Sequence, residues 1–427
     1  MIYNNECGFV IRNSKNTFYR FTLNNYKNLF LQSYNHRGIV SSSVLKKNIT
    51  NFSIDIDSMD KLHILYTSAD GNIKYAIYPS NFHKDINLFS VDDKFNISFL
   101  TLKVVNFKLH VFYILENKFQ PSYKSIYHGF WDNNSFHTIK IEDTTFSKYM
   151  YPYIVEINNN NIYLFYAKTH NSFAVKRFDE NLKNWVNYDD NIFIPYTNNA
   201  NFLINNKNTA LICYNSSFEK NIQTFIKYKS LESPNNSEWS DSIMLSDGNS
   251  NSIHASIINK AANTYVTWEE NGQIIFRKSS WGRNDWNPKK VLTHKKKDFF
   301  IGIYLSNHHT DKDYKSVLTT IDVNIFPYPI INLENNSSSP FYIAKDPINN
   351  SMFISKNNMS KINNAKEKKY IQDLENIIAD KQKKIIELSQ HNLILKNELE
   401  IKNHQLEDIN IKLKKRSWWK RLFNLIF

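Results

Sequence analysis

The chain has 427 residues, of which 41% are hydrophobic and 15% aromatic, so it is long enough to bury a large core. Its formal net charge is +13, but Asn, Lys, Ile, Tyr and Phe are all frequent, which matches AT-rich codons and predicts a low-GC bacterial genome. Part of the charge is then compositional drift, and we expect no nucleic-acid partner on charge alone.

The cysteines and the N-terminal residues indicate the compartment. Only Cys7 and Cys213 occur, which excludes a disulfide framework and a CxxC zinc or redox motif. The first residues, MIYNNECGFVIRN, lack a basic region followed by an apolar run, and no stretch of about 18 apolar residues exists. We expect a cytoplasmic protein, peripheral to the inner face of the membrane if its C-terminal tail binds lipid.

A repeat of about fifty residues dominates the sequence. Each unit holds short segments of alternating apolar and polar residues, separated by turn-forming clusters rich in Asn, Asp and Ser. An aromatic residue recurs in the second segment of each unit, at Tyr19, Tyr66, Tyr113, Tyr166, Tyr214 and Trp268. A second aromatic recurs before the fourth segment, at Phe82, Phe136, Trp185, Trp239 and Trp286. We expect the first set to pack between units and the second to hold the outer turn.

Four strands per unit, repeated six or seven times, predict an all-β propeller over residues 1–333, and we favour seven blades. The seventh would be residues 300–333, which lack the second aromatic and would close the ring with the N-terminus or residues 340–345. The repeat resembles sialidase-like (BNR-like) and lectin propellers over residues 8–333. Their Asp-box reads S-x-D-x-G-x-T-W; the segment 279–286, SSWGRNDW, keeps only the serine and the final Trp. The resemblance therefore implies the fold and not the activity.

The period changes to seven near residue 366. Residues 334–365 are polar and irregular and predict a linker, whereas 366–415 contain unbroken heptads that predict a coiled coil. The heptads place Ile along one core line, Leu along the other, and Asn at one a position. This pattern favours a parallel dimer. The alternatives are a trimer, or a lone helix packed on the propeller. The seam consists of Ile371, Leu374, Ile378, Ile385, Leu388, Asn392, Leu395, Leu399, Leu406, Ile409 and Leu413.

Residues 416–427 form a basic and aromatic tail. Lysine and arginine beside paired tryptophans and bulky aliphatic residues are typical of an amphipathic anchor on an anionic membrane surface. The alternatives are an apolar plug that docks on another protein, or a helix end that folds back on the rod. The residues concerned are Trp418, Trp419, Lys420, Arg421, Leu422 and Phe423.

Catalytic and metal motifs are absent from the sequence. It contains no P-loop, Rossmann glycine pattern, HExxH or GxSxG motif, so we expect no cofactor. The cluster 308–313, HHTDKD, is interpreted as a polar turn and not a metal site. Sialidases need clustered arginines, but their opening Arg-Ile-Pro signature is missing because Arg12 is followed by Asn13.

The candidate ligand contacts are residues that stand outside the repeat positions. Trp131 and Trp281 are the aromatic candidates, Glu269 and Glu270 are expected on a turn after a second strand, and Arg283 follows nearby. We predict a non-enzymatic recognition or scaffold protein whose propeller binds a protein or a glycan. The alternative is a sialidase-like protein that binds or hydrolyses glycans, in which case it would be a glycoside hydrolase.

Overall fold

The computed structural model describes residues 8–329 except 36–37, 80–84, 122–123, 133–134, 146–150, 170, 196, 232–237, 281, 294–298 and 323–327. These residues belong to the first of two units of the chain, Met1–Ile343. The predicted linker, coiled coil and tail lie outside the described residues. Within the described residues, no helix has the length and apolar character that a membrane crossing requires.

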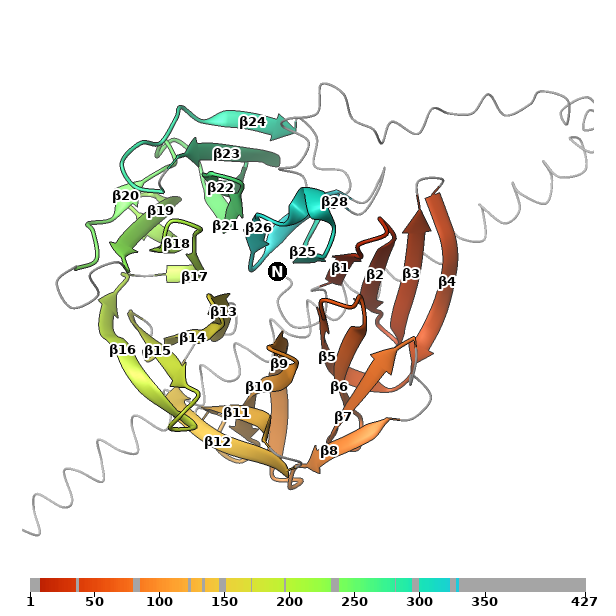
Figure 1. The fold of residues 1–427 in the computed structure, drawn as a ribbon. Coiled ribbons are helices and arrows are strands. Elements are labelled where there is room, and N and C mark those ends of the chain that lie inside the picture. The colour runs from red at the N-terminus through yellow and green to blue at the C-terminus, as the bar shows by residue number, and fades with distance from the viewer. Residues whose placement is uncertain are drawn as a thin grey trace, which may run out of the picture. The chain divides into compact units, whose positions relative to one another are not determined.

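Six β-sheets surround a central axis, and each is one blade of a propeller (Figure 1). Within a blade the four strands follow one another outward, each antiparallel to the last. The blades, numbered in chain order, contain β1 (Gly8–Arg12), β2 (Phe18–Leu23), β3 (Leu29–Asn35) and β4 (Gly38–Lys46); β5 (Ile49–Ile56), β6 (Leu62–Ser68), β7 (Asn72–Tyr78) and β8 (Ile86–Ser90); β9 (Phe95–Val105), β10 (Lys108–Asn117), β11 (Lys124–Asp132) and β12 (Ser135–Thr144); β13 (Tyr153–Asn158), β14 (Asn161–Ala167), β15 (Ser172–Asp179) and β16 (Asn184–Phe193); β17 (Thr197–Ile204), β18 (Thr209–Phe218), β19 (Asn221–Ser230) and β20 (Ile243–Met244); and β21 (Ser252–Lys260), β22 (Asn263–Glu270), β23 (Gln273–Ser279) and β24 (Lys290–Thr293).

The all-β propeller is confirmed, but the favoured count of seven blades is wrong for the described residues. The segment expected to form a seventh blade joins two existing sheets instead. β25 (Phe299–Ser306) pairs in parallel with β1, and β27 (Thr319–Asp322) and β28 (Tyr328–Pro329) extend the same sheet. β26 (Tyr314–Ser316) pairs with β21. Without a partner, the inner edge of β1 would expose its backbone donors and acceptors. Pairing with β25 satisfies them.

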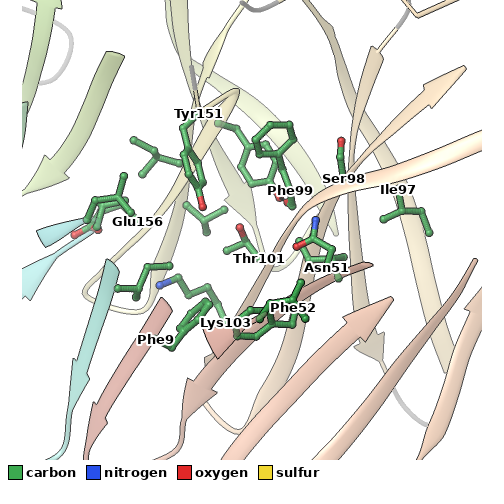
Figure 2. Close-up of a pocket in the computed structure, with 18 of the residues that line it drawn as sticks. Phe9, Asn51, Phe52, Ile97, Ser98, Phe99, Thr101, Lys103, Tyr151 and Glu156 are labelled. Atoms are coloured by element: carbon green, nitrogen blue, oxygen red, sulfur yellow. Dashed lines mark hydrogen bonds between the residues drawn. The ribbon is translucent and has the colours of Figure 1, made fainter. Parts of the chain in front are cut away.

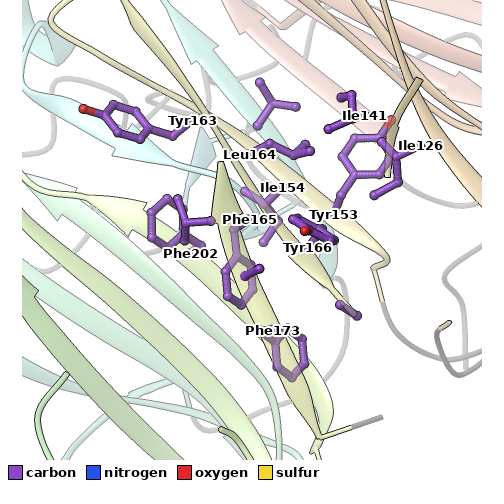
Figure 3. Packing of buried hydrophobic residues seen from close by; sticks show 14 of the residues in the cluster. Ile126, Ile141, Tyr153, Ile154, Tyr163, Leu164, Phe165, Tyr166, Phe173 and Phe202 are labelled. Atoms are coloured by element: carbon purple, nitrogen blue, oxygen red, sulfur yellow. The ribbon is translucent and has the colours of Figure 1, made fainter. Parts of the chain in front are cut away.

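The first set of recurring aromatics packs between blades, as predicted. Tyr66, Tyr113, Tyr166, Tyr214 and Trp268 lie on the second strands of blades 2 to 6 and are at most 4% exposed. Tyr113 of blade 3, for example, packs against Phe89 of blade 2, with ring centroids 5.2 Å apart. Figure 3 shows the same arrangement between blades 4 and 5, where Phe165 stacks on Phe202 at 5.3 Å. The apolar face of each blade is thus buried by contact with the neighbouring blades.

The second set of aromatics links neighbouring blades as well as holding its own turn. Trp239 of blade 5 donates from Nε1 to a carboxylate oxygen of Asp189 in blade 4, at 2.7 Å. Trp185 of blade 4 is buried against Phe112 of blade 3, with centroids 6.0 Å apart. Phe82 lies outside the described residues. These side chains have structural roles, which removes them as ligand contacts.

The segment between β25 and β27 crosses the axis of the ring. Its short 3-10 helix η1 (His309–Asp311) belongs to the predicted polar turn, and Asp311 pairs with Arg12 of blade 1 at 2.9 Å. Asn307 binds the backbone of Asp57 in blade 2, at 2.6 Å. Lys315 reaches the backbone carbonyls of Ile157 in blade 4 and Ile204 in blade 5, at 3.4 and 3.5 Å. The segment therefore touches blades 1, 2, 4, 5 and 6.

Candidate ligand-binding pocket

A cavity of about 380 Å³ occupies the axial channel above this crossing segment (Figure 2). The beginnings of the first strands of blades 2, 3 and 4 form its walls, together with residues of blade 1. Its floor comprises Ser316, Val317 and Leu318. We call the end of the ring at which the first strands begin the pocket face. The cavity lies toward this face, and its volume is in the range of small-molecule sites.

Aromatic rings line part of the pocket wall. Phe99 and Tyr151 are both half-buried, and their rings meet edge to face at 5.8 Å. Phe9 and Phe52, with centroids 5.4 Å apart, contribute to the opposite part of the lining. Such rings offer flat apolar faces on which the C–H face of a small ligand can stack.

The backbone is strained where the aromatic wall is formed. Phe99 has a φ of +53° inside β9, a conformation that bulky residues rarely adopt. The strand pairing shifts by one residue opposite it, between Phe112 and Ile114 of β10. The Tyr153 hydroxyl donates to the Phe99 carbonyl and holds the bulge in place. Strain of this kind is concentrated at functional sites, which supports the pocket as the site of binding.

The charged residues of the lining are Lys103, Glu116 and Glu156, and Lys315 lies beside Glu156. Glu156 is 8% exposed, and its Oε1 lies 3.8 Å from Lys315 Nζ. Burial raises the pKa of Glu156 to about 7, although the charges of Lys315 and Lys103 act in the opposite direction. Near neutral pH this carboxyl group therefore exists in both forms, so it can accept a hydrogen bond or donate one.

Uncharged polar groups complete the lining. Asn51, Ser98 and Thr101 all face the cavity (Figure 2). Ser98 Oγ donates to Glu116 Oε1 at 3.2 Å, and Lys124 Nζ lies 3.5 Å from the same carboxylate oxygen. The pocket therefore combines aromatic faces with several donors and acceptors, and among its described lining residues there is no arginine.

Two of the predicted ligand residues lie outside the pocket, and they belong to a strand and not to the expected turn. Glu269 and Glu270 are the last residues of β22 and not part of a turn, because the turn consists of Asn271 and Gly272 alone, both with positive φ. Glu270 is buried and accepts from Trp268 Nε1 at 3.1 Å and from Ser250 Oγ at 2.8 Å. Glu269 Oε2 lies 3.3 Å from His254 Nδ1.

The other predicted ligand residues are also outside the central pocket. Trp131 is half-buried on β11, with its ring 5.2 Å from Phe136. Arg283 borders a shallow surface depression with Tyr228, Asn284 and Asp285. Trp281 lies outside the described residues. Ligand binding by these residues remains a prediction.

Two charged residues in otherwise apolar segments are the sequence signal for this pocket. Glu156 stands in the apolar segment YIVEI, and Lys103 stands in the apolar segment ISFLTLKVV. A charged residue inside the innermost strand of a propeller blade lies next to the central channel, where it can reach polar groups or solvent. Tyr151 has no comparable signal, since it precedes β13.

No family model matches the sequence, and neither does any curated protein. Among solved structures, the chain is similar to a Hadza microbial sialidase, with 9% identity, a TM-score of 0.42, and coverage of 62% of this chain and 63% of the sialidase. It is also similar to the six-bladed fucose-recognising lectin of Aleuria aurantia, with 9% identity, a TM-score of 0.38, and coverage of 68% and 96%. A prolyl endopeptidase matches with 10% identity, a TM-score of 0.44, and coverage of 76% and 51%. These are distant similarities of fold.

Proposed function

We propose that this chain is a non-enzymatic recognition protein whose propeller binds a short glycan in the central pocket. The observation that carries the proposal is the lining of the central pocket, in which the rings of Phe99 and Tyr151 stand beside Asn51, Ser98 and Thr101. A sugar ring has an apolar C–H face and a rim of hydroxyl groups, so it matches aromatic faces combined with neutral hydrogen-bonding groups.

The charges in the pocket favour a neutral sugar over an acidic one. A carboxylated sugar would need a positively charged partner that is not already neutralised, and an arginine is the usual choice. Lys103 lines the pocket and its charge acts on the carboxyl groups of Asp55 and Glu156. The Lys315 ammonium lies beside Glu156, and Arg12 is committed to a buried ion pair with Asp311. We therefore expect the ligand to be a neutral mono- or disaccharide.

Titration of the full chain with a panel of neutral and acidic mono- and disaccharides by calorimetry tests this proposal. Phe99→Ala should weaken binding of the ligand at least tenfold, because it removes the stacking face. Phe107→Ala is the matched control, since Phe107 is 75% exposed in a turn at the opposite face. Equal binding by the two variants, or binding of acidic sugars only, would contradict the proposal.

Glycoside hydrolysis is a second candidate function, and one observation favours it. The pocket contains two carboxylates, Glu116 and Glu156, and a pKa near 7 suits Glu156 to the role of general acid. Glu156→Gln should then abolish release of the leaving group from an aryl glycoside while sugar binding persists. Absence of turnover in the wild-type chain across the neutral aryl glycosides would exclude this candidate.

The proposed architecture beyond the propeller rests on the sequence. We propose that residues 366–415 dimerise the chain as a parallel coiled coil and that the tail 416–427 attaches it to an anionic membrane surface or a protein partner. Two propellers per dimer would bind a multivalent glycan more tightly than one. Light scattering of the full chain should give a dimer, and a variant with charged residues at Leu388 and Leu395 should be monomeric.

A further inference from the structure

Exposed aromatic side chains are concentrated on the pocket face of the ring. Among the described residues, five aromatic side chains are strongly exposed: Tyr26 (81%), Phe107 (75%), Phe119 (78%), Phe193 (61%) and Phe218 (47%). Exposed rings of this size are costly in water and call for an explanation when they share one face. All except Phe107 belong to the pocket face.

The strand order places these rings around the mouth of the pocket. Tyr26, Phe119 and Phe218 lie at or next to the turn between the second and third strands of blades 1, 3 and 5. Leu23 and Glu116, near the ends of two of these second strands, line the pocket itself. Phe193 ends the fourth strand of blade 4, paired with Ser172 at the start of β15.

Two of these turns are built in the same way. Asn24 Oδ1 accepts a hydrogen bond from the backbone N–H of Tyr26 at 3.1 Å, and Asn117 Oδ1 accepts one from that of Phe119 at 2.9 Å. An asparagine that binds the backbone two residues ahead fixes the turn. Each ring is thus held on a fixed turn and projects from it, rather than lying on the surface of its own blade.

A lysine accompanies each of the three turn aromatics. Lys27 follows Tyr26, Lys118 precedes Phe119, and Lys220 lies two residues after Phe218; all three lysines are exposed. An aromatic ring beside a lysine is the combination found at the interface between a bilayer and water, where the ring enters the headgroup region and the ammonium binds lipid phosphate.

The separation of the rings distinguishes a bilayer from a protein partner. A protein-binding surface is marked by a contiguous apolar patch. Here each ring stands on a different blade among polar residues such as Asn25, Gln120 and Asn221. A fluid interface accepts separated rings independently. We propose that the pocket face docks directly on an anionic lipid bilayer, with Tyr26, Phe119, Phe193 and Phe218 inserted among the headgroups.

Two acidic residues on the same face have local partners, whereas Asp92, Asp93 and Glu219 are exposed there. At the corresponding turn of blade 2, Asp70 accepts from Ser68 Oγ and lies 3.9 Å from Lys74 Nζ. At that of blade 6, Glu269 lies beside His254. These contacts reduce the repulsion that anionic lipid would otherwise meet at blades without an exposed aromatic.

Co-sedimentation of the full chain with vesicles of equimolar phosphatidylcholine and phosphatidylglycerol tests the proposal. All proteins carry Trp418→Ser and Trp419→Ser, so that binding by the tail does not contribute. The test variant carries Tyr26→Ser, Phe119→Ser, Phe193→Ser and Phe218→Ser. The control variant carries Met59→Ser, Phe107→Ser and Leu182→Ser, which remove exposed apolar side chains at the opposite face. Thermal unfolding establishes that both variants are folded.

We expect the test variant to bind at least tenfold more weakly than the background protein, and the control variant to bind equally well. Lys27→Gln, Lys118→Gln and Lys220→Gln should each weaken binding about fivefold, and only on vesicles that contain phosphatidylglycerol. Failure of the background protein to bind, or an equal loss in test and control variants, would overturn the proposal. Retained sugar binding by the test variant would separate this result from the proposed function of the pocket.

Discussion

Arg12 Nη1 lies 2.9 Å from Asp311 Oδ2, and both side chains are buried although they are 299 residues apart in the chain. The same carboxylate oxygen accepts from the Tyr304 hydroxyl at 2.6 Å and from Ser306 Oγ at 2.8 Å. These contacts join the first strand of the ring to the segment that closes it. They also keep the pKa of Asp311 below its usual range, because the hydrogen bonds and the guanidinium together outweigh the effect of burial.

We predict that Asp311→Asn lowers the free energy of unfolding by about 3–5 kcal/mol, since it leaves the Arg12 charge buried without a counter-charge. Urea unfolding followed by circular dichroism measures the change. Lys140→Gln is the control, because its partner Asp143 and Lys140 itself are exposed and the loss should be below about 1 kcal/mol. Equal losses in the two variants would show that the buried pair does not close the ring.

Glu156 is predicted to make the stability depend on pH above its unfolded pKa. The folded pKa of about 7 exceeds the ordinary value of 4.5, so the folded state holds the proton more tightly. The contribution of Glu156 to stability is therefore full below pH 4.5 and is lost as the pH rises to 7 and beyond. Glu156→Gln should gain stability relative to the wild type over this window, by up to about 3 kcal/mol.

Thermal unfolding of the wild type and Glu156→Gln at pH 4.5 and pH 8 measures this difference. Glu219→Gln, an exposed position, controls for the change in net charge. A constant difference between wild type and Glu156→Gln at both pH values would contradict a carboxyl group that is buried in the pocket.

Two buried histidines predict a loss of stability in acid. Trp185 Nε1 donates to His128 Nδ1 at 3.3 Å, so the proton of His128 is on Nε2, which donates to His110 Nδ1 at 3.0 Å. Burial lowers the pKa of His110 to about 4 and that of His128 well below its usual value. Stability is therefore present above pH 6.5 and is lost as the pH falls from 6.5 toward 4.

Replacement of both His110 and His128 by Phe should reduce the loss of folding free energy between pH 6.5 and 4, because Phe does not bind protons. The share of His110 alone is about 3 kcal/mol. Both sites already pack against aromatic rings such as Phe112 and Phe130. The exposed His137→Phe is the control. Unfolding midpoints in urea between pH 4 and 7 report the result; an unchanged acid limb in the double variant would refute this origin.

Gly129 and Phe136 should show a non-additive response to substitution. A Cβ atom at Gly129 would overlap the ring of Phe136, which lies across the strand pair. Gly129→Ala should therefore cost about 1–3 kcal/mol in the wild type and much less in Phe136→Ala. A double-mutant cycle by urea unfolding measures the coupling. Additive effects would mean that Phe136 does not pack on this glycine.

The sequence by itself determined the unit of the fold. Alternating apolar residues and two recurring aromatics specify four-stranded blades, because a blade with one aromatic face is stable only against a copy of itself. The positions of Tyr66, Tyr113, Tyr166, Tyr214 and Trp268 were sufficient to locate the second strands. The heptads and basic tail likewise follow from local pattern, and their prediction is untested.

Only the tertiary structure decided how many blades close the ring and where the pocket lies. Strand periodicity contains no information on which edge a strand will pair with, so residues 300–333 were predicted to form a further blade although β25 pairs with β1. Glu269 and Glu270 likewise looked like turn residues until their pairing placed them in β22. The pocket brings together Phe99, Tyr151 and Glu156 from separate blades and inter-blade segments, and such proximity depends on the closure of the ring, which Arg12 and Asp311 secure.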